Sequence, residues 1–443
     1  MKTDILVIGT GTSGYTIAHG LKKEGKSVAI ADRRSFGGTC AKRGCQPKKY
    51  LVANTEIVHL AKSLEGRGIL KSPEVAWTDL MALKRDFTEK ISVSSEKGFI
   101  DAGIEVFHGD ARFTGNNKVS IGDVSIEADT IILAVGSVPA NLGIPGEEYS
   151  VDSEYFLDMD TMPQRVIFIG GGYISFELAG VAHMAGAETT ILHRSIQPLK
   201  QFDPDLVNTL VETMRADGLS LITEHPVEKI EKTEQGFKVT AGGEYFFADL
   251  LVNASGRVPD FKSLDLEAGN VNFGSKGIEV NKYLQSSSNP DVFAVGDCVA
   301  SGPNLATVAD MQAEIVVANI MNGNSRIPDY TNIPSAVFSL PPMATVGISE
   351  KEAVKQNLDF RINIMDQTSM PSSKRIGQKA AMYKVIIENS TEKIIGVHIL
   401  GHNAPEVINT YALAVKFGHT INELKTVLWA YPTHSSDMKY SLK

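Results

Sequence analysis

The fold follows from a segment near the start of the chain, residues 4–14, which reads Asp4-Ile5-Leu6-Val7-Ile8-Gly9-Thr10-Gly11-Thr12-Ser13-Gly14. Its apolar run over residues 4–8 predicts a buried parallel strand, and residues 15–23 have helical spacing. A second strand is predicted over residues 27–31 and ends at Asp32. In this setting the glycines permit a tight turn that lets a pyrophosphate approach a helix N-terminus, while Asp32 accepts hydrogen bonds from a ribose. The segment therefore predicts a dinucleotide-binding unit.

The same pattern begins again at residue 165. A predicted strand over residues 166–169 leads into Gly170-Gly171-Gly172-Tyr173-Ile174-Ser175, in which a small serine replaces the third glycine. The next strand ends in His193-Arg194, and Lys200 follows. An arginine at this place suits the extra phosphate of NADP, where a carboxylate would suit the ribose hydroxyl of NAD. The alternative is that both cations are ordinary surface charges.

Each half of the chain continues into short strands and a Gly-x-x-Pro turn, over residues 136–139 and 256–259. Two such halves predict two dinucleotides bound to one polypeptide. A further strand ends in Gly296-Asp297, just before a predicted helix that contains Thr307. An acid at the carboxyl end of a strand can hold a ribityl hydroxyl while the helix dipole faces a flavin ring.

Two of the three cysteines lie in the basic stretch Gly37-Gly38-Thr39-Cys40-Ala41-Lys42-Arg43-Gly44-Cys45-Gln46-Pro47-Lys48-Lys49. In a regular helix their Cα atoms would be about 7.5 Å apart along the axis, whereas a disulfide needs about 4.4–6.8 Å. Bridging Cys40 to Cys45 therefore needs an irregular first turn, and the glycines provide that freedom. The nearby cations lower thiol pKa values and favour a reactive thiolate. The alternative is a pair of buried, unreactive cysteines in a basic loop.

Composition excludes several classes of function. The net charge of −9 argues against general binding to nucleic acids or anionic membranes. No apolar run approaches the roughly 20 residues of a membrane span, and the start of the chain predicts a strand and not a signal peptide. Three cysteines in 443 residues argue against a secreted, disulfide-stapled protein. We therefore expect a cytoplasmic location.

With these motifs assembled, the chain resembles the pyridine nucleotide–disulfide oxidoreductases of the glutathione reductase type, which include dihydrolipoamide dehydrogenase and mercuric reductase. The likeness includes the stretch over residues 337–347 near the start of the last domain. The resemblance implies an α/β fold with two Rossmann-like, doubly wound dinucleotide-binding domains and an α+β C-terminal dimerisation domain. It divides the chain into an FAD-binding domain with the redox disulfide (1–145), an NAD(P)-binding domain (146–264), a central domain that completes the FAD site (265–333) and an interface domain (334–443).

The resemblance also implies two sets of cofactor contacts. The expected contacts to FAD are Gly9, Gly11, Gly14, Asp32, Thr39, Lys48, Ala111, Gly136, Asp297 and Thr307. The expected contacts to NADP are Gly170, Gly172, Tyr173, Ile174, Glu177, Arg194, Lys200 and Gly256. NADPH is the expected reductant, with NADH as the alternative, and no metal is expected.

The catalytic roles come from the same likeness. Cys45 corresponds to the sulfur against the flavin that forms the charge-transfer thiolate, and Cys40 corresponds to the outer sulfur that attacks the substrate. Lys48 and Glu177 match the ion pair beside flavin N5, and Tyr173 matches the gate that moves when nicotinamide binds. The implied chemistry is a hydride relay from NADPH to the flavin, then to the sulfur pair and the acceptor. The resemblance also implies active sites that are shared across a homodimer.

The chain departs from the disulfide-reducing pattern near its C-terminus. Those relatives carry His-Pro-Thr with a Glu five residues after the His, whereas here Tyr431 and Ser436 stand at the two places. Mercuric reductases also carry Tyr there, together with a C-terminal cysteine pair that residues 440–443 lack. His434 is the nearest replacement base, with Asp437 as its candidate partner. The alternative is that His434 is a solvated or packing histidine.

These observations are compatible with three alternative functions. The first is an FAD-dependent NAD(P)H:disulfide oxidoreductase that acts on a small-molecule or small-protein disulfide, for which glutathione specificity is doubtful because the family's first-helix arginine falls at His19. The second uses the same relay to reduce a metal ion, a quinone or another electrophile. The third is a catalytically silent flavin-binding regulatory protein, against which the set Cys40, Cys45, Lys48 and Glu177 argues.

Overall fold

The computed structural model describes residues 1–442, which form two compact units. The first unit holds residues 1–49, 82–140 and 256–330, and the second holds residues 50–81, 141–255 and those from 331 onward. Helices α3 (Cys45–Ser63) and α4 (Trp77–Asp101) run from one unit into the other. The four-domain division is finer than these units and stays a prediction.

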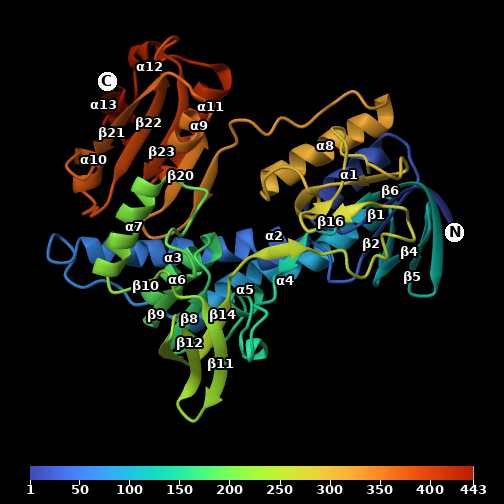
Figure 1. Ribbon diagram of the computed structural model, residues 1–443, viewed down its shortest axis with the longest axis horizontal. Coiled ribbons are helices and arrows are strands. Elements are labelled where there is room, and N and C mark those ends of the chain that lie inside the picture. The colour runs from blue at the N-terminus through green and yellow to red at the C-terminus, as the bar shows by residue number, and fades with distance from the viewer. Residues whose placement is uncertain (443) are drawn as a thin grey trace. The chain divides into compact units, whose positions relative to one another are not determined.

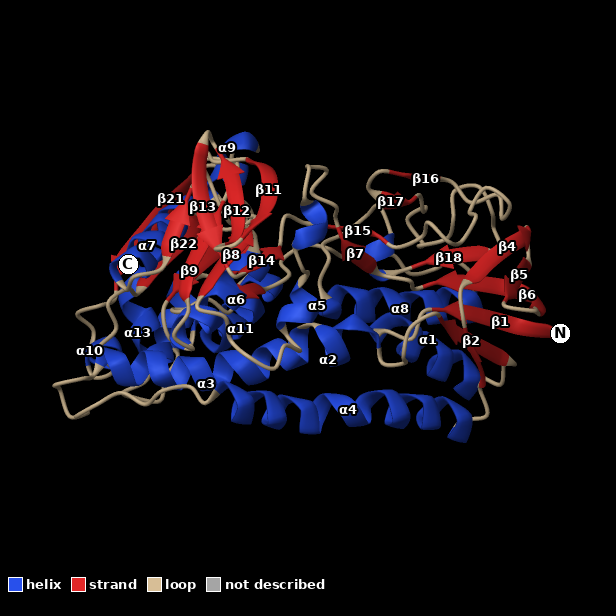
Figure 2. Ribbon diagram, turned by 90° about the horizontal axis from the view of Figure 1, so that it is seen from below, coloured by secondary structure: helices blue, strands red, loops and turns tan. Residues whose placement is uncertain are grey.

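The first unit is built on a seven-stranded sheet in which β3-β2-β1-β6-β5-β4 lie in that order and β18 pairs with β6 (Figure 2). Its elements are β1 (Lys2–Ile8), α1 (Thr12–Lys23), β2 (Val28–Asp32), α2 (Gly38–Arg43), β3 (Glu105–His108), β4 (Ala111–Gly115), β5 (Lys118–Ile121), β6 (Val124–Leu133), β7 (Ser137–Pro139), β15 (Arg257–Pro259), β16 (Phe273–Gly274), β17 (Gly277–Ile278), β18 (Val292–Ala294), the 3₁₀ turn η2 (Gly296–Cys298) and α8 (Ala306–Asn322). The strands paired with β1 and with β18 are parallel.

The central strand β1 is buried on both of its faces. Leu6 and Ile8 enter one apolar cluster, while Ile5 and Val7 enter another. A strand covered on both sides has no solvent face, so its sequence is a continuous apolar run rather than an alternating one. Helix α1 covers one side together with α8. The predicted strand, helix and second strand are confirmed, with boundaries displaced by a few residues.

The second unit contains a four-stranded parallel sheet, β10-β9-β8-β14, a three-stranded antiparallel sheet and a five-stranded antiparallel sheet. Its first part comprises η1 (Glu147–Tyr149), α5 (Ser153–Phe156), β8 (Arg165–Ile169), α6 (Tyr173–Met184), β9 (Glu188–Leu192), α7 (Pro204–Ala216), β10 (Ser220–Ile222), β11 (Val227–Thr233), β12 (Gly236–Ala241), β13 (Glu244–Ala248) and β14 (Leu250–Asn253). Strand β8, helix α6 and strand β9 form the second predicted dinucleotide-binding pattern.

The C-terminal part of this unit is the antiparallel sheet β19-β20-β23-β22-β21, drawn in orange to red in Figure 1. It comprises β19 (Ser335–Val337), β20 (Met343–Gly347), α9 (Glu350–Lys355), β21 (Phe360–Asp366), α10 (Pro371–Lys374), β22 (Met382–Glu388), β23 (Ile394–Leu400), α11 (Ala404–Phe417), α12 (Ile421–Thr426) and α13 (His434–Ser441). Helix α11 packs on β20 and β23, and α13 packs on β21 and β22. Between residues 1 and 442, the structure has no helix with the length and apolar character of a membrane span.

Candidate active site

The first glycine-rich turn is closely packed. A Cβ on Gly9, whose φ is +110°, would lie 2.2 Å from the carbonyl oxygen of Ala134, and one on Gly14 would lie 1.9 Å from Gly9 O. Only glycine fits at either place. Gly11 is the N-cap of α1 and provides no side-chain cap. The N-terminus of α1 therefore presents backbone N–H groups and the positive end of the helix dipole, as a pyrophosphate requires.

Asp32 lies at the end of β2, beside this turn. Its Oδ2 accepts hydrogen bonds from the backbone N–H of Thr10 (2.9 Å) and from Thr10 Oγ1 (2.7 Å), while Oδ1 accepts one from Arg34 N (2.9 Å). A carboxylate offers about four acceptor positions, so these bonds orient Asp32 and leave it capacity for a ribose. The turn and its carboxylate thus fit the nucleotide part of FAD.

The carboxylate of Asp297 is hydrogen-bonded by a residue from the first half of the sequence. Its Oδ2 accepts a hydrogen bond from Ser137 Oγ (2.8 Å), and that hydroxyl in turn accepts one from Arg257 Nε (2.9 Å). The geometry arises because β7 and β15, the two Gly-x-x-Pro turns, pair with each other as antiparallel strands. Neither Ser137 nor Arg257 is among the site residues predicted from the sequence, although the repetition of the turn was the signal that could have found them.

The other predicted FAD contacts are scattered along this unit. Ala111 begins β4, where it pairs with Ile121 of β5, and packs its side chain into the apolar cluster. Gly136 precedes β7, and a Cβ added there would meet no other atom within 4 Å. Thr307 is exposed in the first turn of α8. Thr39 lies in α2. These contacts stay predictions.

The redox stretch is broken at the glycine between the two cysteines. Helix α2 ends at Arg43, Gly44 has the non-helical dihedrals φ −143° and ψ −104°, and α3 begins at Cys45. The irregular turn expected from the disulfide geometry is therefore present. At the other end, a Cβ on Gly38 would lie 2.3 Å from the Cα of Gly11. The redox stretch thus packs directly on the first glycine-rich turn, backbone against backbone.

The two thiols interact with each other. Cys40 is half-buried, and its hydrogen bond with Cys45, helped by burial and by the charge of Cys45, raises the pKa of Cys40 well above its usual range. The charge of Lys48 acts in the opposite direction. Because the first proton to leave such a pair raises the affinity for the second, Cys40 holds its proton more tightly than an isolated thiol does. Cys298 is fully buried, and burial raises its pKa to about 11.

The second glycine-rich turn shares two features with the first, namely a close backbone approach at its first glycine and a glycine N-cap at the start of the helix. A Cβ on Gly170 would lie 2.3 Å from Ala254 O, whereas one on Gly172 would meet no protein atom within 4 Å. Gly172 is the N-cap of α6 and again provides no side-chain cap. The space at Gly172 and the uncapped helix N-terminus fit a second pyrophosphate.

The remaining predicted NADP contacts surround this turn. Tyr173 is exposed and Ile174 half-buried, in the first turn of α6. Glu177 is buried, and its Oε1 accepts a hydrogen bond from the backbone N–H of Phe338 (2.9 Å). Arg194 and Lys200 are exposed beyond the end of β9, and Gly256 precedes β15. The ion pair between Lys48 and Glu177 stays a prediction.

The predicted C-terminal residues lie at the start of α13. Tyr431 is 69% exposed, whereas His434 is half-buried and Asp437 is buried. The ring of His434 meets the ring of His402, which is not among the site residues predicted from the sequence. His19, at the place of the family's arginine, stacks on Phe99 with ring centroids 5.2 Å apart.

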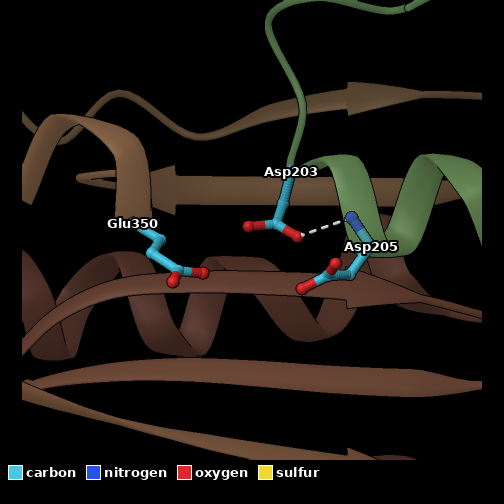
Figure 3. A group of neighbouring side chains, drawn as sticks. All are labelled: Asp203, Asp205 and Glu350. Carbon is cyan, nitrogen blue, oxygen red and sulfur yellow. Dashed lines mark hydrogen bonds between the residues drawn. The ribbon is translucent and has the colours of Figure 1, made fainter.

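Three carboxylates gather elsewhere in the second unit, those of Asp203, Asp205 and Glu350 (Figure 3). Such a group can bind a divalent cation. Here the ammonium group of Lys384 lies among them, 2.9 Å from Asp203, 2.7 Å from Asp205 and 2.6 Å from Glu350. Lys384 and Asp203 are both buried. The cluster is thus an ion-pair network in which a buried lysine joins one buried carboxylate, Asp203, to two half-exposed ones.

Comparisons with known proteins agree with this geometry. Residues 3–313 match the pyridine nucleotide-disulphide oxidoreductase family, and residues 333–442 match the dimerisation domain of that family. The chain is 31% identical over 447 residues to a mercuric reductase of Staphylococcus aureus, covering 98% of this chain and 81% of that protein. It is also 31% identical over 451 residues to a glutathione reductase of Nostoc, covering 98% of each.

A solved structure has the same fold. The Cu(II) complex of the HOCl-induced flavoprotein disulfide reductase RclA from Escherichia coli superimposes with a TM-score of 0.91 and 24% identity, covering 100% of this chain and 99% of that one. The chain therefore belongs to the pyridine nucleotide–disulphide oxidoreductase family. It is an FAD-dependent, NAD(P)H-using flavoprotein oxidoreductase with a dimerisation domain, as the sequence predicts.

Proposed function

We propose that Cys40 and Cys45 are the sulfur pair through which this enzyme delivers the electrons of NADPH to a disulfide acceptor. The supporting observation is the geometry of the pair: two hydrogen-bonded thiols at a broken helix start, packed on the turn expected to hold FAD. FAD, when bound, supplies the hydride chemistry that connects the nicotinamide with the sulfur pair.

The thiol chemistry follows from the two protonation states. Cys40 gives up its proton to a base and attacks one sulfur of the acceptor, which releases one thiol and leaves a mixed disulfide. The thiolate of Cys45 then attacks the Cys40 sulfur, closes the Cys40–Cys45 disulfide and releases the second fragment as a thiolate, which takes its proton from solvent. Two electrons pass to the acceptor. Because Cys40 holds its proton tightly, the first step needs a base, and Tyr431 and His434 are the candidates.

The test is anaerobic NADPH consumption with a panel of small disulfides, including those of glutathione, lipoamide and coenzyme A. We expect one member to give two thiols for each NADPH consumed. If the panel gave none while NADPH still reduced the flavin, the disulfide assignment would be wrong.

A second candidate keeps the sulfur pair but delivers the electrons to a metal ion, a quinone or another electrophile. Two observations favour it: Tyr431 stands where mercuric reductases carry Tyr, and mercuric reductases are among the similar proteins. This would place the chain in a subgroup with Tyr instead of the usual catalytic His. Turnover with Hg²⁺ or Cu²⁺ in place of the disulfides would support it.

The homodimer with shared active sites is part of the proposal and is supported by the match to the dimerisation domain. The cytoplasmic location and the four domain boundaries stay predictions from the sequence.

NADPH preference over NADH is assigned to Arg194 and Lys200. We expect Arg194→Glu to lower the NADPH-to-NADH ratio of kcat/KM at least about tenfold, because a charge-assisted hydrogen bond to phosphate contributes about 1.5–3 kcal/mol. Steady-state kinetics with both nucleotides measures it. Lys232→Glu, an equal charge change at an exposed position of β11, should leave the ratio unchanged. An unchanged ratio in Arg194→Glu would remove the assignment.

Gly172 offers a test of the NADPH pyrophosphate site. We expect Gly172→Ala to fold normally, because the added methyl meets no protein atom within 4 Å, and to raise the KM for NADPH about tenfold. The methyl would occupy space that the pyrophosphate needs. Gly98→Ala, where the added Cβ also meets nothing within 4 Å, is the matched control. An unaltered KM would place the pyrophosphate elsewhere.

A further inference from the structure

The residue that follows strand β9 takes the place that Asp32 takes in the first unit. In the first unit, Gly9 N–H donates to the carbonyl oxygen of the residue before Asp32 (2.7 Å). In the second unit, Gly170 N–H donates to the carbonyl oxygen of the residue before His193 (2.9 Å). Asp32 and His193 therefore occupy equivalent positions beside their two glycine-rich turns.

His193 contacts its turn in a different way from Asp32. Its ring is buried and lies against Gly171, where an added Cβ would be 2.5 Å from the ring carbon Cγ and 2.6 Å from Nδ1. Asp32 instead accepts hydrogen bonds from Thr10, the residue at the corresponding place in the first turn. The histidine ring is thus packed on the backbone of the turn, with Nδ1 buried in the contact.

The other ring nitrogen of His193 closes the loop after β9. Nε2–H donates to the carbonyl oxygen of Gln197 (3.1 Å). Further along, Leu199 N–H donates to Gly171 O (2.8 Å), and Leu199 has a φ of +45°, in the left-handed region that leucine rarely adopts. The loop over residues 193–199 is therefore held against Gly171 at both ends, by a ring at one end and by a backbone hydrogen bond at the other.

This loop carries the two cations assigned to the extra phosphate of NADPH. Arg194 follows His193 directly and Lys200 follows Leu199, so each cation adjoins one of the two points of attachment. Both are exposed, and Lys200 Nζ donates to Ser195 Oγ (3.3 Å) within the loop. Two long side chains bind one phosphate together only when the backbone that carries them is held in place, because orientation is part of the binding free energy.

The surroundings of His193 favour a neutral ring. Burial lowers the pKa of His193, the bond to the Gln197 carbonyl opposes this, and the charges of Lys200 and Arg194 lower the pKa further. Within residues 1–442, no group forms a hydrogen bond with Nδ1, so a second proton there would be buried without an acceptor. The ring therefore holds the loop without adding a charge of its own beside a bound phosphate.

We propose that His193 is a positioning residue for NADPH: it holds the loop against the pyrophosphate turn so that Arg194 and Lys200 reach the 2′-phosphate together. This rests on the proposed function, which assigns NADPH preference to these two cations. NAD(H) lacks the 2′-phosphate. The contact should therefore strengthen the binding of the phosphorylated nucleotide and leave that of the other nearly unchanged.

Isothermal titration calorimetry of the FAD-loaded enzyme with NADP⁺ and with NAD⁺ tests this without any acceptor. His193→Leu removes the Nε2–H donor, and we expect it to raise the Kd for NADP⁺ about tenfold while changing the Kd for NAD⁺ less than about twofold. His193→Gln, whose amide nitrogen can take the place of Nε2, should restore most of the NADP⁺ affinity. His193→Asn is too short to reach Gln197 O and should behave like His193→Leu, so it provides the same test if leucine prevents folding.

His183→Leu is the matched control. His183 Nε2 also bonds to a backbone carbonyl, that of Asp217 (3.0 Å), but it lies at the opposite end of α6 from the turn. Both Kd values should be unchanged in this variant.

Two results would overturn the positioning role. One is an unchanged Kd for NADP⁺ in His193→Leu and His193→Asn. The other is an equal loss of affinity for NADP⁺ and NAD⁺, since that would mean that the ring only stabilises the turn. A nucleotide preference unaltered in Arg194→Glu would instead contradict the cofactor assignment, and the role of His193 would then be wrong as well.

Discussion

Replacing Cys40 with serine is expected to lower acceptor reduction by at least about 10³-fold while NADPH still reduces the flavin at a rate close to that of the unmodified enzyme. Serine has no sulfur with which to form the mixed disulfide, but it leaves the glycine-rich turns and the Gly38–Gly11 contact unaltered. Anaerobic stopped-flow absorbance follows the flavin, and thiol release measures the acceptor step. The result separates the two halves of the reaction.

Cys298→Ala is the matched control, because this third cysteine is fully buried in the core and donates to Leu133 O and Val295 O. It should retain acceptor turnover. In Cys45→Ser the attack by Cys40 should still occur, and mass spectrometry should find one acceptor fragment bound per chain, because no second sulfur resolves the mixed disulfide. Substantial acceptor turnover in Cys40→Ser would mean that the electrons leave the enzyme by another route.

Replacing Lys384 with methionine is expected to lower the free energy of unfolding by about 3–5 kcal/mol. Lys384 has no exposed surface, and its removal leaves the buried carboxylate of Asp203 without its cation. Asp205 and Glu350 are about half exposed and keep their solvation. Urea denaturation of the FAD-loaded enzyme, followed by far-UV circular dichroism, measures the change.

Two further variants show that the effect comes from the buried charge. Lys355→Met removes an exposed lysine from the neighbouring helix α9 and should change the free energy of unfolding by less than about 0.5 kcal/mol. Adding Asp203→Asn to Lys384→Met should recover most of the loss, since the orphaned charge is gone. If Lys384→Met were as stable as the unmodified enzyme, the network would have no net role in stability.

Much of the fold could be predicted because its signals are local. The strand–turn–helix patterns at Gly9–Gly14 and Gly170–Ser175, and the broken helix at Gly44, each depend on a few consecutive residues whose backbone needs glycine. The family resemblance then assigned roles to the cysteine pair and to the two nucleotide sites, and these roles stay predictions. The structure adds the physical reasons: the close packing at Gly9 and Gly14, and the uncapped starts of α1 and α6.

The features that were missed depend on residues far apart in the sequence. Glu56 and His402, whose Oε1 and Nδ1 atoms lie 3.0 Å apart, are separated by 346 positions, and Ser137 and Arg257 by 120. Neither pair has a local pattern, because a lone Glu and a lone His occur on many surfaces. The partner of His434 was sought along its own helix at Asp437, whereas the sheet and its loops bring His402 to it from the side. Such contacts become visible only when the topology is known.

The contact between Gly38 and Gly11 bears on which side chains of the redox stretch can vary between similar proteins. The redox stretch rests on the first glycine-rich turn through the close approach of Gly38 to Gly11 and through the hydrogen bond from Gly37 N–H to Thr10 Oγ1 (3.2 Å). Substitutions on the outer surface of α2 leave these contacts in place, so side chains of the redox stretch can vary while its packing on the turn is kept. That is consistent with the similar identity of this chain to proteins named for reducing glutathione and for reducing mercury.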